Sequence, residues 1–481
     1  MNSNFSKTTI VSGLFWRFLE RIGAQGVHFV VSIVLARILA PELFGIITLI
    51  NVFIAILEVF VDSGLGNALI QKKDADDLDF STVFYFNLAS CCVLYFAMFL
   101  AAPFISRFYK MPELTSAIRA ISFILVISGV KNVQQAYVSR TMQFKRFFYA
   151  TLGGTIGAAI LGIWMAYAGF GLWALIAQSL FNTTVDTIIL WITVKWRPKK
   201  MFSFRRLKSL LSYGGKLLVS ALLDTIYNKV RQLIIGRMYT PANLAFYEKG
   251  GNFPAVITNN INTSINSVLF PAMSSVQDDR EAVKRMTRQS IVVCSYILWP
   301  LMMGLAACAE PLVVLILTEK WLPCVFYLRI FCIIYAFYPV HTANLNAIKA
   351  LGRSDIFLKL ETMKKVIGML LLFISMWFGV EMIAYSLLIS TVASVLINSW
   401  PNRRMLNYSY LQQIKDILPS ILLSSIMSII VWSVQFLHLG VMYTLIIQVI
   451  VGFFVYFLGS LLFKLEGYSY VVSIMKRLLN T

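Results

Sequence analysis

The sequence predicts an all-α membrane protein that crosses the bilayer many times. Hydrophobic residues make up 58% of its 481 residues and charged residues only 13%, whereas about a quarter of the residues in a soluble domain are charged. Mean hydropathy is +0.75. The apolar stretches are continuous, as in ILLSSIMSIIVWSVQFL at 421–437, which indicates helices because membrane β-strands alternate apolar and polar residues.

About fourteen apolar stretches fit in the chain at about 30 residues per span and loop, so no room remains for a soluble domain. The first stretch carries charges and is not followed by a small-residue cleavage site, so we expect it to be retained as a span. The expected spans cover 11–37, 42–62, 82–107, 115–139, 148–168, 171–195, 209–237, 243–268, 286–317, 324–348, 358–379, 382–401, 416–436 and 440–463.

Two halves of the chain repeat one pattern at an offset of about 200 residues. Val34–Pro41 resembles Ile234–Pro241, with an Arg and a Pro at matching positions. Later matches keep the same order: Leu65–Leu69 with Ile265–Leu269, Arg119 with Arg329, and Gly169–Ala174 with Gly379–Ala384. Because six spans separate the halves, both copies have the same orientation, and rocking of the halves would give alternating access.

This repeat predicts the organisation of the chain. We expect two pseudo-symmetric six-helix bundles, a basic cytoplasmic linker between them, and two extra C-terminal helices. The predicted parts are an N-terminal six-helix bundle at 1–195, the linker at 196–208, a second six-helix bundle at 209–404, and helices 13–14 with a cytoplasmic tail at 405–481.

The formal net charge of +20 is distributed as a membrane topology requires. Lys and Arg concentrate in alternate loops, above all in the linker, with Lys195, Arg197, Lys199, Lys200, Arg205, Arg206 and Lys208. By the positive-inside rule both termini are cytoplasmic. Most of the charge is therefore explained by topology, and nucleic acid is not an expected partner.

Cysteines and acidic residues show no clear metal or disulfide pattern. The six cysteines lie within or at the ends of spans, without zinc-ligand spacing, so we interpret them as small packing residues. The loop Gln71–Phe80 holds four aspartates. They could bind a divalent ion or serve a glycosyltransferase, but solvated residues that cap the next helix are the favoured interpretation.

Arg37 and Pro41, like Arg237 and Pro241, mark a helix end in each half. An Arg in the last turn suits the negative end of the helix dipole, and a Pro cannot continue the helix. A gate on the outer face of the membrane is the alternative interpretation.

Two spans carry unusual charges. Leu14–Leu39 contains Arg17, Glu20, Arg21 and His28, and Tyr213–Thr240 contains Lys216, Asp224, Lys229 and Arg231. A charge at membrane depth costs about 2.5–3.5 kcal/mol on insertion scales, so such groups face a bundle interior or a watery cavity. We predict that the two spans form matching walls of one cationic, anion-selective cavity.

Candidate roles follow from charge. Cationic side chains can bind a diphosphate or acidic sugars, and acidic ones can hold those cations or couple transport to Na+ or H+. The substrate-binding candidates are Arg17, Arg21, Lys216, Lys229 and Arg231. The coupling or charge-pairing candidates are Glu20, Asp186, Asp224, Glu58 and Asp62, of which the last two are weaker.

The stretches SGLFWRFLERIGAQGVHFVVSIVLARILAPELFGIITL at 12–49 and LEVFVDSGLGNALIQ at 57–71 resemble flippases of the multidrug/oligosaccharidyl-lipid/polysaccharide (MOP) exporter superfamily. The similarity is strongest to the exopolysaccharide branch, of the colanic and teichuronic acid type, and covers nearly the whole chain. It implies a flippase in the bacterial inner membrane that moves an undecaprenyl-diphosphate-linked oligosaccharide to the outer leaflet. Membrane lipids, a polysaccharide polymerase and export machinery are the implied partners.

Several alternatives stay open. A peptidoglycan lipid-precursor flippase would also need a cationic cavity. An ion-coupled drug exporter for cationic drugs should carry mid-span acids without excess bases. A membrane glycosyltransferase or polymerase that uses lipid-linked sugars would need a sizeable outer loop. The chain has no GxxxxGK[ST] phosphate loop, which disfavours ATP-driven transport by this chain alone. We expect a transporter rather than an enzyme, without a cofactor other than a coupling ion.

Overall fold

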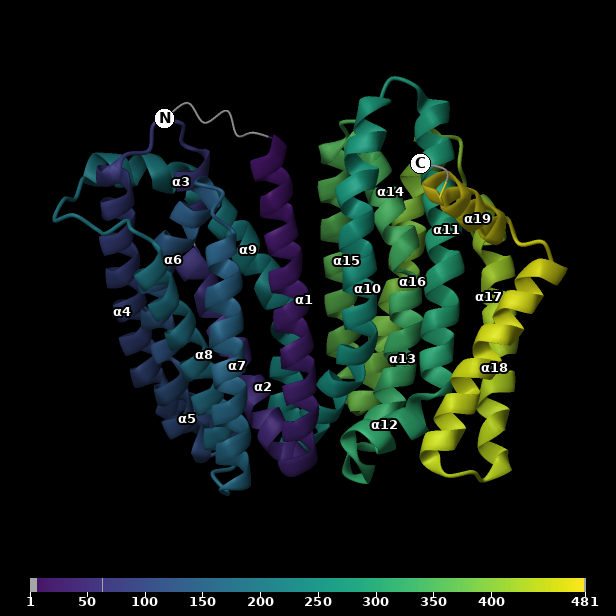
Figure 1. The fold of residues 1–481 in the computed structure, drawn as a ribbon, viewed down its shortest axis with the longest axis horizontal. Coiled ribbons are helices and arrows are strands. Elements are labelled where there is room, and N and C mark those ends of the chain that lie inside the picture. Colours follow the sequence, from purple (N-terminus) through teal and green to yellow (C-terminus); the bar gives the residue numbers. More distant parts are fainter. Residues whose placement is uncertain (1–6, 63, 480–481) are drawn as a thin grey trace. The chain divides into compact units, whose positions relative to one another are not determined.

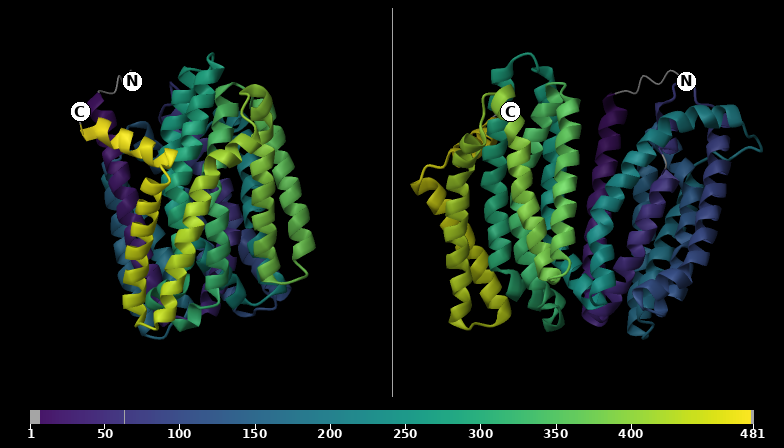
Figure 2. Two further views of the ribbon diagram at one scale, coloured as in Figure 1. Left: turned by 90° about the vertical axis from the view of Figure 1, so that its right-hand side faces the viewer. Right: turned by 180° about the vertical axis from the view of Figure 1, so that it is seen from behind.

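The computed structural model describes residues 7–62 and 64–479 (Figure 1). The described residues form helices and contain no strand, so the all-α prediction is confirmed. The chain divides into two compact units, Met1–Leu244 (unit 1) and Ala245–Thr481 (unit 2). Within each unit, long helices run side by side (Figures 1 and 2).

Unit 1 contains α1 (Lys7–Ile38), α2 (Pro41–Asp62), α3 (Leu65–Gln71), α4 (Asp77–Tyr109), α5 (Glu113–Ile121), α6 (Phe123–Arg140), α7 (Lys145–Tyr167), α8 (Leu172–Thr193) and α9 (Phe204–Met238). Helix α10 (Pro241–Ser275) begins at the end of this unit and continues into unit 2.

The rest of unit 2 contains α11 (Arg280–Ala307), α12 (Ala309–Leu317), η1 (Glu319–Trp321), α13 (Cys324–Ala336), α14 (Tyr338–Ala350), α15 (Ser354–Ser375), α16 (Val380–Met405), α17 (Tyr410–Ser433), η2 (Val434–Leu437), α18 (Val441–Leu462) and α19 (Glu466–Leu479).

Eleven helical stretches of the described chain are long and apolar enough to cross a membrane, so the protein is a multi-pass membrane protein. Helices α9, α10 and α15 lie outside this group although they have 35, 35 and 22 residues. At about 1.5 Å per residue they also suffice to span a bilayer. They are more polar, with Arg231 in α9, Asn262 in α10 and Lys364 in α15. With these three, the helices are compatible with the predicted count of about fourteen spans.

The helix order of the first half recurs in the second. Helix α1 ends at Ile38 and α2 begins at Pro41, while α9 ends at Met238 and α10 begins at Pro241. Arg37 and Arg237 occupy the last turns, as the capping interpretation requires. Each Pro occupies the first position of the next helix, where its missing N–H is not needed.

Further matches between the halves lie deeper in the chain. Arg119 donates from Nε to the carbonyl of Phe99 at 3.2 Å, and Arg329 makes the same contact with Ala306 at 3.4 Å. Helices α8 and α16 both begin after a glycine with positive φ, +55° and +114°. The matched arginines therefore make the same kind of contact to the preceding long helix.

Helix α9 packs on α2, α3 and α4 of unit 1. The compact units therefore divide after α9, whereas the repeat-based prediction placed this helix in the second bundle. The predicted bundles follow sequence similarity between the halves and stay a prediction.

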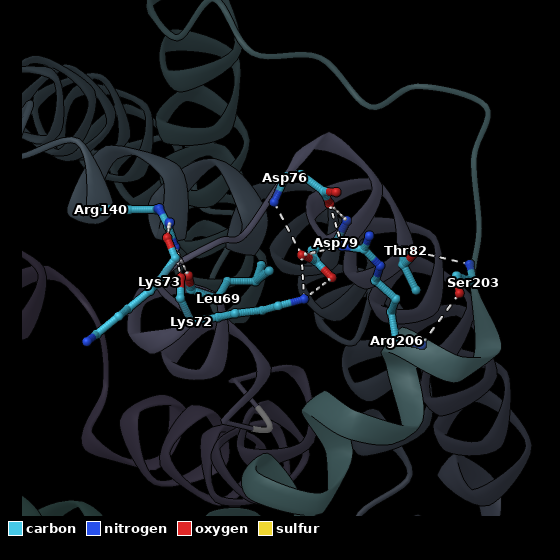
Figure 3. Close-up of polar contacts among 9 residues, drawn as sticks. All are labelled: Leu69, Lys72, Lys73, Asp76, Asp79, Thr82, Arg140, Ser203 and Arg206. Carbon is cyan, nitrogen blue, oxygen red and sulfur yellow. Dashed lines mark hydrogen bonds and ion pairs between the residues drawn. The ribbon is translucent and has the colours of Figure 1, made fainter. Parts of the chain in front are cut away.

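The acidic loop and the basic linker bind each other at one end of unit 1 (Figure 3). Asp76 caps α4 through a reciprocal capping box with Asp79. Asp79 is fully buried and accepts from Lys72 Nζ at 2.7 Å and Arg206 Nη1 at 3.0 Å. Capping of the next helix is thus confirmed, but Asp79 is not solvated as expected. Burial raises the pKa of Asp76, but hydrogen bonds from the Asp79 amide and Arg206 outweigh it and lower this pKa overall.

The linker itself is anchored on the same surface. The Trp196 ring is 7% exposed and stacks on Tyr137 at 6.3 Å. Gln134 donates to the Trp196 carbonyl at 3.1 Å, and the amide of Ser203 donates to Thr82 at 3.1 Å. The chain that leads into α9 is therefore held against unit 1.

Candidate functional site

Unit 1 has an open polar cavity of about 330 Å³ between α1, α3, α6 and α7. Hydroxyl and amide side chains dominate its lining, together with one ion pair. The polar lining residues are Arg17, Glu20, Asn67, Asn132, Gln135, Ser139 and Thr151. Such a lining presents both donors and acceptors, which suits hydroxyl-rich ligands.

The ion pair of this cavity lies on one face of α1. Arg17 and Glu20 are three residues apart, so their side chains are neighbours on the helix, and Arg17 Nη1 donates to Glu20 Oε2 at 2.8 Å. Thr151 Oγ1 of α7 donates to the other carboxylate oxygen at 3.2 Å. The guanidinium carbon of Arg17 lies 4.3 Å from the centre of the Phe147 ring. Glu20 thus offsets the positive charge of Arg17.

Arg231 in α9 lies in a different environment. The residue is 7% exposed, and its Nε and Nη2 are buried without a hydrogen-bond partner among the described residues. The ring of Tyr227 lies 6.0 Å from its guanidinium carbon. Nε and Nη2 form the edge that binds carboxylate or phosphate through two parallel hydrogen bonds. This edge of Arg231 is buried in the structure and makes no hydrogen bond to the described residues.

Asp186 pairs with a residue outside the cavity. Its Oδ2 accepts from Lys131 Nζ of α6 at 3.0 Å, and both side chains are largely buried. Glu20 and Asp186 are therefore each paired with a cationic side chain, and their roles in transport stay predictions.

The structure brings together only part of the predicted site. Of the predicted residues, Arg17 and Glu20 line the polar cavity, whereas Arg231 and Asp186 are not in its lining. Arg21 and Asp224 are exposed, and Lys229 and Glu58 are partly buried. The side chains of Lys216 and Asp62 lie outside the described part of the chain. A single cavity shared by α1 and α9 stays a prediction.

The uncharged lining residues were missed from the sequence. Asn132, Gln135 and Ser139 recur at the spacing of one helix face on α6, and Asn67 and Thr151 come from α3 and α7. Polar residues at positions i, i+3 and i+7 of an apolar helix are a readable signal. These residues carry no charge, so they do not stand out in an apolar span as Arg17 and Glu20 do.

Unit 2 has an apolar pocket of about 560 Å³ lined mainly by α11, α12, α17 and α18. Leu301, Val449 and Phe453 are typical lining residues, and Gly304 and Gly452 leave room beside them. Gln448 also lines it and donates to the Val431 carbonyl at 3.1 Å. Such a pocket suits a hydrocarbon chain. The described residues contain no group of three or more His, Cys, Asp or Glu that could hold a metal ion.

The chain is similar in sequence to two proteins of bacterial polysaccharide biosynthesis. The succinoglycan biosynthesis transport protein ExoT of Rhizobium meliloti (strain 1021) is 24% identical over 67% of this chain and 65% of its own length. The match thus spans slightly less than two thirds of that relative. The lipopolysaccharide biosynthesis protein WzxC of Escherichia coli (strain K12) is 25% identical over 74% of this chain and 72% of its own length.

A solved structure shares the fold. The lipid II flippase MurJ in an inward closed conformation superposes with a TM-score of 0.74, over 95% of this chain and 99% of that one, at 15% identity. The model of the polysaccharide biosynthesis protein family matches residues 34–326. The predicted resemblance is thus confirmed at the level of the family: the chain belongs to the polysaccharide biosynthesis protein family.

Proposed function

We propose that this protein flips an undecaprenyl-diphosphate-linked oligosaccharide repeat unit from the cytoplasmic to the outer leaflet. Transport would proceed by alternating access and supply the synthesis of an exopolysaccharide, a capsule or an O-antigen. We place the protein in the bacterial cytoplasmic (inner) membrane with both termini in the cytoplasm. Family membership and the names of the relatives support this proposal.

The unpaired edge of Arg231 is the observation that carries the proposal. A diphosphate has about two negative charges, and its transfer into a membrane interior requires hydrogen-bonded partners. Nε and Nη2 of Arg231 have no hydrogen-bond partner among the described residues, so a phosphate that reaches them when the surrounding helices move apart would not have to displace an existing hydrogen bond. The unpaired guanidinium favours an anionic ligand over the organic cations of a drug exporter.

The polar cavity would receive the sugars. Amides and hydroxyls match sugar hydroxyls, and because Glu20 offsets the charge of Arg17, this pocket suits neutral or weakly charged sugars better than phosphate. Arg21, Lys229 and Lys216 stay candidates for additional contacts to the anion.

The proposal is tested by measuring how fast the protein, reconstituted in proteoliposomes, moves a fluorescent diphosphate-linked oligosaccharide lipid from one leaflet to the other. We expect Arg231→Gln to reduce transfer at least about tenfold, because a charge-assisted bidentate contact is lost, and Arg231→Lys to restore it only partly. Arg205→Gln is the matched control, since Arg205 lies on the same helix and is exposed in its first turn.

Equal transfer by the parent and the Arg231→Gln protein would exclude a role of Arg231 in anion binding. No transfer by the folded parent would favour another cargo, such as a peptidoglycan lipid precursor or a drug. Repeating the assay with imposed Na+ and H+ gradients tests our proposal that one of these ions drives transport, with Asp224, Glu58 and Asp62 as candidate coupling groups.

A further inference from the structure

The C-terminal helix α19 departs from the direction of the span before it. Helix α18 ends at Leu462, and α19 begins only a few residues later, at Glu466. Between them Lys464 adopts a left-handed conformation with φ +49°, which is uncommon for a residue with a side chain. Helix α19 then runs at a steep angle to α17 and α18 (Figures 1 and 2). Because α18 is a candidate span, α19 begins where that span leaves the membrane.

Exposure along α19 follows the period of an amphipathic helix. Glu466, Ser469, Ser473 and Lys476 are exposed, whereas Gly467 is buried and Tyr468, Val471 and Val472 are partly buried. The exposed positions recur every three or four residues, so they share one face. The sequence continues this pattern with apolar Ile474, Met475, Leu478 and Leu479 and with a second basic residue, Arg477.

An ionic cluster holds the first turn of α19 in place. Arg288 of α11 donates to both oxygens of Glu466 at 2.6 Å and from Nη2 to Asp416 of α17 at 2.9 Å. Tyr408 donates to the other oxygen of Asp416 at 2.6 Å. A Cβ placed on Gly467 would lie 2.5 Å from Cβ of Tyr296. The start of α19 is therefore fixed against α11, and its acidic residue is already paired.

Glu466, the acidic residue of α19, is paired with Arg288. The net charge of α19 and of the short segment between α18 and α19 is therefore positive. Lys464 and Lys476 are exposed, and Arg477 adds a third positive charge in the sequence. A helix with one apolar face, basic residues beside its polar face, and a start at the membrane boundary has the properties of an interfacial helix. Anionic phospholipid headgroups are the ligand that complements such a charge.

We propose that α19 is an interfacial helix that binds anionic phospholipid headgroups through Lys464 and Lys476, while Arg288 and Glu466 hold its first turn on α11. Its apolar side then faces the acyl-chain boundary and the body of unit 2. This inference does not depend on the cargo that the protein transports.

Nitroxide labels on the full-length protein test the proposal. The six native cysteines are first replaced by alanine, and a single cysteine is then introduced at exposed Ser473 or at partly buried Val472. Each protein is reconstituted in phosphatidylcholine vesicles with or without about one third phosphatidylglycerol. We expect the Val472→Cys label to be more accessible to oxygen and the Ser473→Cys label to a water-soluble nickel complex. Phosphatidylglycerol should increase the difference in oxygen and nickel accessibility between the two labels by about twofold. The double variant Lys476→Glu and Arg477→Glu should remove this increase.

Lys359→Glu is the control, because Lys359 is an exposed basic residue of α15 outside the proposed surface. Native mass spectrometry of the unlabelled proteins provides a second measurement: the double reversal should retain fewer phosphatidylglycerol molecules than the Lys359→Glu protein. A contrast between the labels that does not change with lipid charge or charge reversal would overturn the proposal and indicate a helix that docks on protein alone. Equal water accessibility of both labels would overturn it as well.

Discussion

The matched helix pairs α6–α8 in unit 1 and α14–α16 in unit 2 are linked by different polar contacts. In unit 1, Lys131 and Asp186 form an ion pair at 3.0 Å. In unit 2, Asn398 and the His341 ring nitrogen Nδ1 are 3.0 Å apart, and Asn402 donates to Asn344 at 2.6 Å. Corresponding helices thus use a charge pair in one half and amides in the other.

This difference shows that helix packing and electrostatics vary separately in the two halves. A hydrogen bond between amide side chains holds two helices together without placing a net charge in the protein interior. An ion pair holds them too, but it places full charges in the interior, and removal of one partner leaves the other uncompensated. Unit 1 also has the polar cavity and the unpaired Arg231, whereas unit 2 has the apolar pocket. We interpret unit 1 as the half that handles the polar part of a ligand.

The largest expected effect comes from breaking the ion pair of unit 1. Asp186→Leu should destabilise the protein by about 3–5 kcal/mol, because it leaves Lys131 charged and buried. Asn398→Leu in unit 2 should cost only about 1–3 kcal/mol. The double change Lys131→Leu and Asp186→Leu should recover most of the loss. The stability of the parent, the two single variants and the double variant is measured by thermal unfolding in detergent. If Asp186→Leu and Asn398→Leu lower the stability equally, the proposed difference between the two units is wrong.

A second prediction concerns the corner between α1 and α2. A Cβ on Gly45 would lie 1.8 Å from the Pro241 carbonyl oxygen, whereas the matching residue, Ala245, already carries one and is 1% exposed. Gly45→Ala should therefore lower stability by about 1–3 kcal/mol through overpacking. Gly26→Ala is the control, since nothing lies within 4 Å of its Cβ. If both substitutions have the same unfolding temperature as the parent, the close approach at Gly45 is not required.

The smallest expected effect is the pH dependence of two acid–arginine contacts outside the spans. Hydrogen bonds from Arg288 outweigh the effect of burial and lower the pKa of Glu466, much as Asp79 and Arg206 lower that of Asp76. The ordinary pKa is 4.5 for Glu466 and 3.8 for Asp76, and both are lower in the folded protein. Each contact therefore stabilises the folded protein at a pH above the ordinary pKa, and this stability is lost as pH falls through the pKa of the folded state.

Both contacts are partly exposed, so each should contribute less than about 1 kcal/mol. We expect the unfolding temperature to fall between about pH 5 and pH 3, and Glu466→Gln and Asp76→Asn should each make this decrease shallower. Glu113→Gln, at an acid in the first turn of α5, is the control. An unchanged pH profile in both variants would show that these contacts do not contribute to acid sensitivity.

Part of the candidate site could be predicted because charge is visible in a sequence. Arg17 and Glu20 stood out as charges in an apolar span, and both line the cavity. Asn67, Gln135 and Thr151 were not recognised, because a single amide or hydroxyl in a span costs little and occurs for many reasons. Their role becomes evident only when α3, α6 and α7 bring them together around one volume.

The helical class, the multi-pass character and the Arg and Pro corners could all be predicted from the amino-acid sequence, because hydropathy, continuity and the backbone limits of Pro are local properties. The folded structure was needed to show that Asp186 pairs with Lys131, that Asp79 is buried between Lys72 and Arg206, and that α9 packs with unit 1. These outcomes depend on which helix faces approach each other, and the partners can be tens to more than a hundred residues apart in the chain.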